Sequence, residues 1–402
     1  MTTETIPAPA VRPVPGGKTK AGRLAYIDWM RGLAILIMIQ AHALDSWTRL
    51  ADRKTLAYGI SAILAGFAAP MFLFLAGVSV SLGASARTRR TGDMRAAAAS
   101  VRRRGWEIFG LAFLFRFQAY LLNPSAMMAG LFKVDILNIM GPSIVAAAAL
   151  WQAGRTHWRR LAFFAAAALA MTLLTPPVRI THAIDWLPGI VEWYLRPAAG
   201  RSNFTFFPWA GFVFAGGLVG VLLDRRPANE RRFHGWLLAG SLAFAALAYA
   251  GSYVPSIYSN SQFWTTAPTF FFLRVGIVTA VLSVVYFYER RPRLFTRHLP
   301  RAQGLDRRAE RSEARAESLE PRAVLASPMA LFGQSSLFVY WVHTELAYGF
   351  ATAPLHKALP FWTAVAAFAA FTVFMFALTL LKNRAVAWWK ARRLAVGEPA
   401  RA

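Results

Sequence analysis

The 402-residue sequence contains no cysteine, which excludes disulfides, thiolate metal sites and cysteine nucleophiles. Acidic residues are scarce too, with 19 Asp and Glu against 45 Lys and Arg, so the formal net charge is +26. All charged residues together make up only 16% of the chain, whereas hydrophobic residues make up 56%. A soluble core of this length needs less apolar surface than this. The excess predicts contact with a lipid bilayer.

The hydrophobic residues are concentrated in blocks of about 17 to 25 residues, the length at which a helix crosses a ~30 Å hydrocarbon layer. We therefore predict an all-α fold, a polytopic transmembrane bundle of about ten helices. The predicted spans are 27–46, 57–82, 105–122, 134–152, 160–175, 206–223, 235–253, 269–288, 328–350 and 360–381.

Most Lys and Arg residues lie between these blocks. This distribution is typical of cytoplasmic loops under the positive-inside rule, and it argues against a surface that binds nucleic acid. Both termini are then predicted to be cytoplasmic. Residues 1–25 are predicted to be a disordered cytoplasmic tail, and 26–385 a transmembrane domain with a cytoplasmic insert at 289–327. Residues 386–402 are predicted to be a second tail. The long outer connection 176–205 is rich in Pro and Trp, which favours a re-entrant or interfacial segment that could roof a site.

Polar residues in the first span form one stripe, because Asp28, Arg31, His42 and Asp45 follow helical spacing. Ionisable groups in hydrocarbon are costly and usually face the bundle interior or a wet cavity. Arg31 and His42 are separated by about 16 Å of helix rise, so this stripe would join both leaflets. The pattern is also compatible with a structural role, in which Asp28 caps the helix and pairs with Arg31 while His42 reaches outer water.

The ninth span brings a second histidine, His343, to the outer half of the bundle. A structural interpretation of His343, as a hydrogen-bond partner for a neighbouring helix, stays open. Further buried polar groups fall at the same depth, namely Arg116, Asp135, Asn138 and Arg274. We predict that the two arginines join a charged network around the histidines, with Asp45, Asp135 and Glu345 as the carboxylates.

Five strings of residues resemble, in order, the bacterial branch of the heparan-alpha-glucosaminide N-acetyltransferase catalytic-domain family. They are Asp28-Trp-Met-Arg31-Gly32 with His42, Pro70-Met-Phe-Leu-Phe-Leu-Ala-Gly77-Val-Ser79, Asp135-Ile-Leu-Asn138-Ile-Met-Gly141, Phe207-Pro208-Trp209-Ala-Gly211 with Gly216-Gly217, and Ser336-Leu-Phe-Val-Tyr340-Trp-Val-His343. The resemblance implies acyl transfer from acetyl-CoA to a sugar or glycan acceptor at the bacterial cytoplasmic membrane. The animal enzymes use a histidine just after the first helix, whereas this chain has none between His42 and His157.

Acyl transfer to a hydroxyl or amine needs a base and a group that stabilises an oxyanion. We assign the role of base or acyl carrier to His42 or His343, orientation of the imidazole to Asp45, and oxyanion contacts to Asn138 with Arg116, Arg274 or Tyr340. The donor acyl-CoA is assigned to Asp28, Arg31, Arg116 and Arg274, with the Arg102–Arg104 cluster also near its phosphates. No metal site is predicted.

Two other functions are compatible with these residues. A transporter or flippase for a small anion or a lipid-linked sugar would also bury Arg, His and Asp groups. A noncatalytic membrane scaffold would tolerate alanine throughout the stripe from Asp28 to Asp45.

Overall fold

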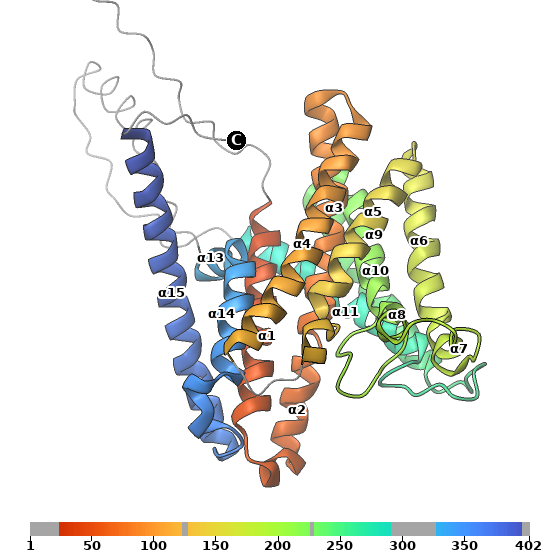
Figure 1. Cartoon of the computed structure of the whole chain (residues 1–402). Coiled ribbons are helices and arrows are strands. Elements are labelled where there is room, and N and C mark those ends of the chain that lie inside the picture. Colours follow the sequence, from red (N-terminus) through yellow and green to blue (C-terminus); the bar gives the residue numbers. More distant parts are fainter. Residues whose placement is uncertain (1–23, 123–127, 226–228, 291–326, 396–402) are drawn as a thin grey trace, which may run out of the picture.

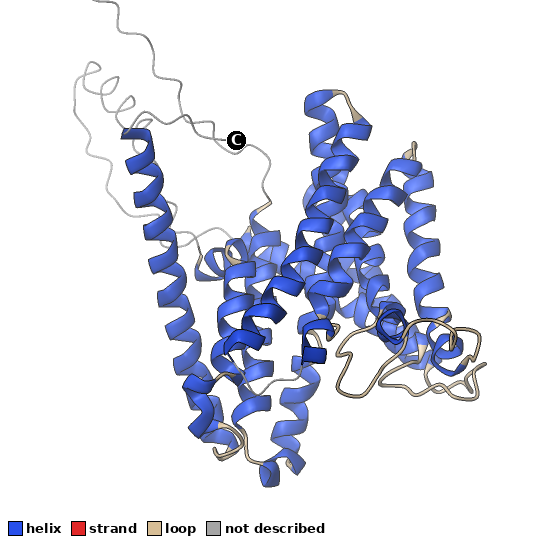
Figure 2. Cartoon of the chain, viewed as in Figure 1, coloured by secondary structure: helices blue, strands red, loops and turns tan. Residues whose placement is uncertain are grey.

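The computed structural model describes residues 24–122, 128–225, 229–290 and 327–395. Within these ranges the chain is helical and contains no β-strand, only two isolated bridges between single residues. The all-α prediction is therefore confirmed (Figure 2). Nearly all of the predicted tail 1–25, most of the insert 289–327 and the end of the tail 386–402 lie outside the described residues.

The long helices pack as a bundle of roughly antiparallel rods (Figure 1). They are α1 (Ala25–Trp47), α3 (Ala68–Thr91), α4 (Met94–Leu122), α5 (Ile136–Ala153), α6 (His157–Leu173), α9 (Phe206–Asp224), α10 (Glu230–Gly251), α11 (Pro268–Glu289) and α15 (Phe361–Ala395). The shorter helices are α2 (Leu56–Ala65), α7 (Thr175–Ile180), α8 (Gly189–Leu195), α13 (Pro328–Gln334) and α14 (Ser336–Tyr348), with 3-10 turns η1 (Leu50–Lys54), η2 (Met128–Phe132) and η4 (Phe350–Leu355).

Eight helical segments of the described chain are long and apolar enough to cross a membrane, which confirms a polytopic bundle. The other two expected spans fall on α4, which carries several arginines, and on the α13–α14 pair, which is interrupted at Ser335. The start of α1 and the end of α15 lie at the same end of the bundle (Figure 1). We name this the inner end and the opposite one the outer end, after the predicted orientation.

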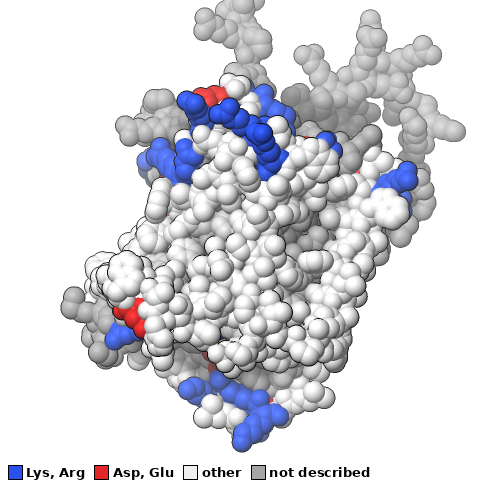
Figure 3. All heavy atoms as spheres, turned by 90° about the vertical axis from the view of Figure 1, so that its right-hand side faces the viewer, with Lys and Arg blue, Asp and Glu red and all other residues white. Residues whose placement is uncertain are grey.

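An uncharged belt crosses the face of the bundle shown in Figure 3. On the face shown in Figure 3, charged side chains gather toward the two ends, and the broad zone between them carries none. Exposed tryptophans flank the belt, with Trp158 and Trp236 near the inner starts of α6 and α10, and Trp264 and Trp362 near the outer starts of α11 and α15. Tryptophan favours the two membrane interfaces, so this distribution supports residence in a bilayer.

Helix α1 lies at the centre, packed against α3, α11, α13, α14 and α15. Glycines allow its backbone to touch that of α13, because a Cβ added at Gly32 would overlap the carbonyl of Met329 and one at Gly333 would overlap that of Asp28. Small residues at such crossings let membrane helices approach closely. Contact of this kind positions α14, which continues from α13, alongside the outer half of α1.

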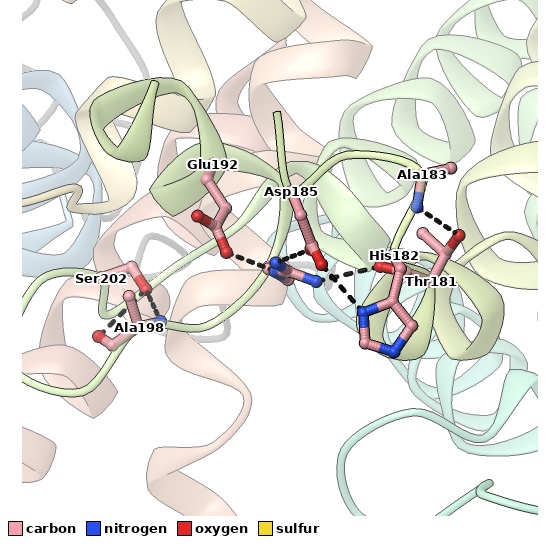
Figure 4. Close-up of polar contacts among 8 residues, drawn as sticks. Thr181, His182, Ala183, Asp185, Glu192, Ala198 and Ser202 are labelled. Carbon is pink, nitrogen blue, oxygen red and sulfur yellow. Dashed lines mark hydrogen bonds and ion pairs between the residues drawn. The ribbon is translucent and has the colours of Figure 1, made fainter. Parts of the chain in front are cut away.

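Arg196 holds together the outer connection between α6 and α9, and its partners Thr181, Asp185 and Glu192 are labelled in Figure 4. Its guanidinium binds the carboxylates of Asp185 and Glu192, each at 2.5 Å, and donates to the carbonyl of Thr181 at 3.0 Å. His182 is 2.8 Å from the other oxygen of Asp185. These contacts join α7 and α8, and Tyr194 then ties α8 to Asn138 of α5 at 3.3 Å. We call residues 181–202 the outer strap.

Replacing Arg196 by glutamine should loosen the outer strap, because three segments of it would lose their shared partner. We expect faster amide exchange over residues 181–202 at pH 7, measured by hydrogen–deuterium exchange, with unchanged protection in α5 and α9. Arg155→Gln, in an exposed loop at the inner end, is the control. Equal exchange in the two variants would contradict the central role of Arg196.

The same strap should weaken in acid. Hydrogen bonds from His182 and Arg196 lower the pKa of the Asp185 carboxyl. A group with a lowered folded-state pKa contributes stability above its unfolded pKa, here about 3.9, and loses it as the pH falls through the folded value. After correction for the slower intrinsic exchange of amides in acid, the protection of the strap is therefore expected to fall below about pH 4, and not between pH 5 and 8, on account of this carboxyl.

Candidate active site

The two histidines predicted as catalytic residues are in direct contact. Nδ1 of His42 on α1 lies 2.8 Å from Nε2 of His343 on α14, and the two rings are parallel within 5°. His343 is fully buried, whereas His42 is partly exposed. The structure thus brings together two side chains that are 301 residues apart in the sequence.

The neighbouring hydrogen bonds determine which ring nitrogens carry protons when both histidines are neutral. Nδ1 of His343 is 2.7 Å from the carbonyl oxygen of Val339, which can only accept, so this nitrogen carries hydrogen. Nε2 of His343 is then an acceptor and receives the Nδ1 hydrogen of His42. The remaining nitrogen, Nε2 of His42, keeps a lone pair. His343 therefore orients His42 and holds it in the tautomer whose Nε2 can take a proton.

A cavity of about 1220 Å³ adjoins His42 at the outer end of the bundle. Its walls come from the outer halves of α1, α3, α4 and α14, from η4 and from the connections that precede α5 and α9. We call it the histidine cavity. Its charged and titratable lining residues are His42, Asp45, Arg116, Lys133, Asp135, Tyr340, Glu345, Tyr348 and His356.

Arg116 and Asp135 form an ion pair within this cavity, one of several pairings that the predicted charged network allowed. Arg116 donates to Oδ2 of Asp135 at 2.7 Å, and the hydroxyl of Tyr340 is 3.4 Å from the same oxygen. Asp135 also caps α5 through the amide of Ile136 at 2.8 Å. The helix N-terminus and Arg116 therefore both contact the Asp135 carboxylate, which lines the same cavity as His42.

Lys133 adds a second cation to the lining, at a loop position that the sequence did not single out. Burial lowers the pKa of its ammonium group, and the nearby charge of Arg116 lowers it further. Tyr348 also lines the cavity, with its ring 5.6 Å from that of His42. Nothing in the local sequence pattern of Lys133 or Tyr348 distinguishes them from ordinary interfacial residues.

Asp45 and Asn138 have contacts that differ from their predicted roles. Asp45 lines the cavity, but its carboxylate accepts from Arg53 at 3.2 Å and from the Tyr348 hydroxyl at 2.9 Å, and His42 is oriented by His343 instead. Asn138 is buried and completes a capping box with Asp135, its side-chain oxygen accepting from the Asp135 amide at 3.0 Å. Asn138 does not line the cavity.

The four residues assigned to the donor are dispersed. Asp28 and Arg31 pair at 3.0 Å near the inner end, where Arg31 also contacts the Ser79 hydroxyl. Neither lines the histidine cavity, whereas Arg116 does. Arg274 lies beside a second cavity, at the outer end of α11. Among the described residues Arg274 forms no ion pair, so the expected carboxylate partner is not found.

The fold and the site together define a polytopic membrane protein with a histidine pair beside a cavity at one end of its helix bundle. The family model described as heparan-alpha-glucosaminide N-acetyltransferase, catalytic, matches residues 23–263. The chain therefore belongs to this family of transmembrane acetyltransferase-like proteins, as its motifs predicted. No individual curated protein matches it. The matched region contains His42, Arg116 and Asp135, while His343 and Arg274 lie beyond it.

Proposed function

We propose that the protein is an acyltransferase that moves an acetyl or other acyl group from cytoplasmic acyl-CoA to an extracytoplasmic sugar or glycan acceptor. The observation that carries this proposal is the hydrogen-bonded chain from Val339 through His343 to His42, which leaves a proton-accepting nitrogen on a residue that lines a large cavity. Membership of the family supports the reaction class.

The chemistry requires one proton to move twice. Nε2 of His42 takes the proton of the acceptor hydroxyl or amine while the acceptor atom attacks the thioester carbonyl. Collapse of the tetrahedral intermediate breaks the carbon–sulfur bond, and His42 returns the proton to the departing thiolate. The imidazolium formed in between is stabilised by the carboxylates of Asp45 and Asp135 in the same cavity.

Cations in the histidine cavity can stabilise the negatively charged oxygen of this tetrahedral intermediate. Arg116 and Lys133 both line it, and the Tyr340 hydroxyl is a further donor. Such donors act most strongly where water is scarce, because the effective dielectric constant is low. Arg31, about 16 Å of helix rise from His42, remains our candidate for the donor phosphates at the inner end. In this arrangement the thioester arm extends through the bundle between the two ends.

The proposal is tested by incubating purified protein in detergent with labelled acetyl-CoA. We expect saturable donor binding, slow thioester hydrolysis, and transfer of label to an added glycan. A stable acyl-enzyme would assign His42 as an acyl carrier instead of a base. Donor-independent flux of an anion or lipid-linked sugar in proteoliposomes, without any acetyl-CoA binding, would instead establish the transporter alternative.

Replacing His343 tests its role as a positioning residue. His343→Leu cannot accept the Nδ1 hydrogen of His42, so kcat should fall on the order of 10²-fold with KM for acetyl-CoA little changed. In His343→Gln the side-chain oxygen can accept that hydrogen, and most of the activity should return. Equal loss in the two variants, measured in steady-state assays on folded protein, would contradict orientation by hydrogen bonding.

A further inference from the structure

A second cavity of about 370 Å³ adjoins the histidine cavity at the outer end. Two arginines line it, Arg179 from the last turn of α7 and Arg274 from the second turn of α11. We call it the arginine cavity. It shares four wall residues with the histidine cavity, namely Ala65, Ala69, Asn203 and Phe204.

The two arginines lack anionic partners within the described part of the chain. No ion pair or hydrogen bond joins either guanidinium to another described residue, and the Nε atoms of both are buried without an acceptor. No Asp or Glu is present in the lining. Arg274 stacks on the ring of Phe270, whose centroid lies 4.0 Å from Cζ of Arg274. Two like charges facing one apolar cavity repel each other unless an anion lies between them.

The chemistry of the lining indicates the kind of anion. A guanidinium presents paired donors that match phosphate oxygens. Most other lining side chains are apolar, including Trp209, Phe212, Trp264 and Phe271. Such walls suit a ligand whose charged group is attached to hydrocarbon or to a sugar ring. The outer end of the bundle is also the depth at which lipid phosphates lie.

We infer that Arg179 and Arg274 form a binding site for a phosphoryl group, carried by an amphiphilic molecule that enters at the outer end. Each arginine contributes donors to the phosphoryl oxygens, and the aromatic walls hold the attached group. The site is distinct from the histidine pair, and its cavity shares wall residues with the histidine cavity.

Because the histidine cavity lies next to the phosphoryl site, this site has a specific role in the proposed acyl transfer. A phosphoryl group held by Arg179 and Arg274 would anchor an acceptor whose attached sugar reaches past Ala65 and Ala69 toward His42. This assignment of the amphiphile as acceptor rests on the proposed function, whereas the phosphoryl site itself does not.

The test measures binding and not turnover. Delipidated protein in a neutral maltoside detergent is titrated with phosphatidic acid and, separately, with diacylglycerol of the same acyl chains, and complexes are quantified by native mass spectrometry. We expect phosphatidic acid to bind and diacylglycerol not to bind. Arg179→Gln and Arg274→Gln should each weaken binding at least about tenfold, as expected for loss of a charge-assisted hydrogen bond.

Matched variants keep the test interpretable. Arg201→Gln, an arginine on the outer side that stacks on Trp193 and lines neither cavity, should bind like the wild type. Arg274→Lys retains the charge and should bind with intermediate affinity even if the glutamine variant folds poorly. His42→Ala should bind phosphatidic acid normally, so failure of the acyl-transfer proposal and failure of this one give different results.

Inorganic phosphate is titrated in a third series to identify the source of the phosphoryl group. Arginine-dependent binding of phosphate alone, as tight as that of phosphatidic acid, would support the site and assign it to a soluble ligand. Equal binding of phosphatidic acid by the wild type and both glutamine variants would overturn the inference. Equal binding of diacylglycerol and phosphatidic acid would overturn it too.

Discussion

His42→Ala is expected to reduce acyl transfer from acetyl-CoA by about 10²- to 10⁴-fold, the usual contribution of a positioned proton acceptor. The variant removes the ring whose Nε2 is left with a lone pair by the hydrogen bond to His343. Donor binding should change little, because His42 lies far from Arg31 along α1. Steady-state transfer of labelled acetyl groups and equilibrium binding of acetyl-CoA would be measured on the same preparation.

The matched control is His157→Ala, a histidine at the inner start of α6 that lines neither cavity. It should retain wild-type turnover. The two variants should also share the elution volume and helicity of the wild type, because His42 is at the edge of a cavity and its truncation leaves the helix contacts of α1 in place. Retention of full activity by His42→Ala would exclude this residue as base and as acyl carrier.

Gly77→Ala is expected to have the largest effect on stability. A Cβ at this position of α3 would overlap the carbonyl oxygen of Val213 and lie 2.7 Å from the amide nitrogen of Gly217, both in α9. These atoms belong to helix backbone and cannot rotate away, so α3 and α9 must separate. We expect destabilisation of about 1–3 kcal/mol or more, the range for overpacked cores. Thermal unfolding in detergent, followed by light scattering or intrinsic fluorescence, would measure it.

Gly83→Ala provides the control within the same helix. Nothing lies within 4 Å of a Cβ added there, so the substitution should be neutral or stabilise α3 by up to about 1 kcal/mol through helix propensity. A similar loss of stability in the two variants would show that helix propensity or insertion, and not the α3–α9 contact, accounts for the effect at Gly77.

The membrane helices could be predicted from the sequence because each needs only a run of apolar residues of sufficient length. All ten predicted spans fall on helices, although the span 57–82 is divided between α2 and α3 and α15 continues to Ala395, beyond the predicted end at 381. The break at Ser335 was not predicted. The break falls in the polar stretch Gly333-Gln334-Ser335-Ser336, which separates α13 from α14. The apolar residues on both sides still add up to the length of one span, so a count of hydrophobic residues over the whole segment did not reveal it.

The histidine pair could be predicted only in part. Spacing placed His42 and His343 at similar depth, but whether two rings meet depends on which helices are neighbours and on their rotation, and neither is encoded in one helix's periodicity. Asp45 illustrates the same limit, since η1 turns the chain back and brings Arg53 to its carboxylate. The structural role of Asn138 could be predicted from the sequence, because Asp135 and Asn138 have the spacing of a helix capping box.

The glycine contacts between α1 and α13 have a consequence for the far end of the molecule. Backbone touches backbone at Gly32 and Gly333, and the same two segments of chain meet again at His42 and His343. Sliding or rotating one helix against the other at the inner end would therefore misalign the imidazoles more than two helical turns away. Substitutions at the inner end would then change the geometry of the histidine pair, and any ligand bound between these helices would be coupled to the geometry of the outer end.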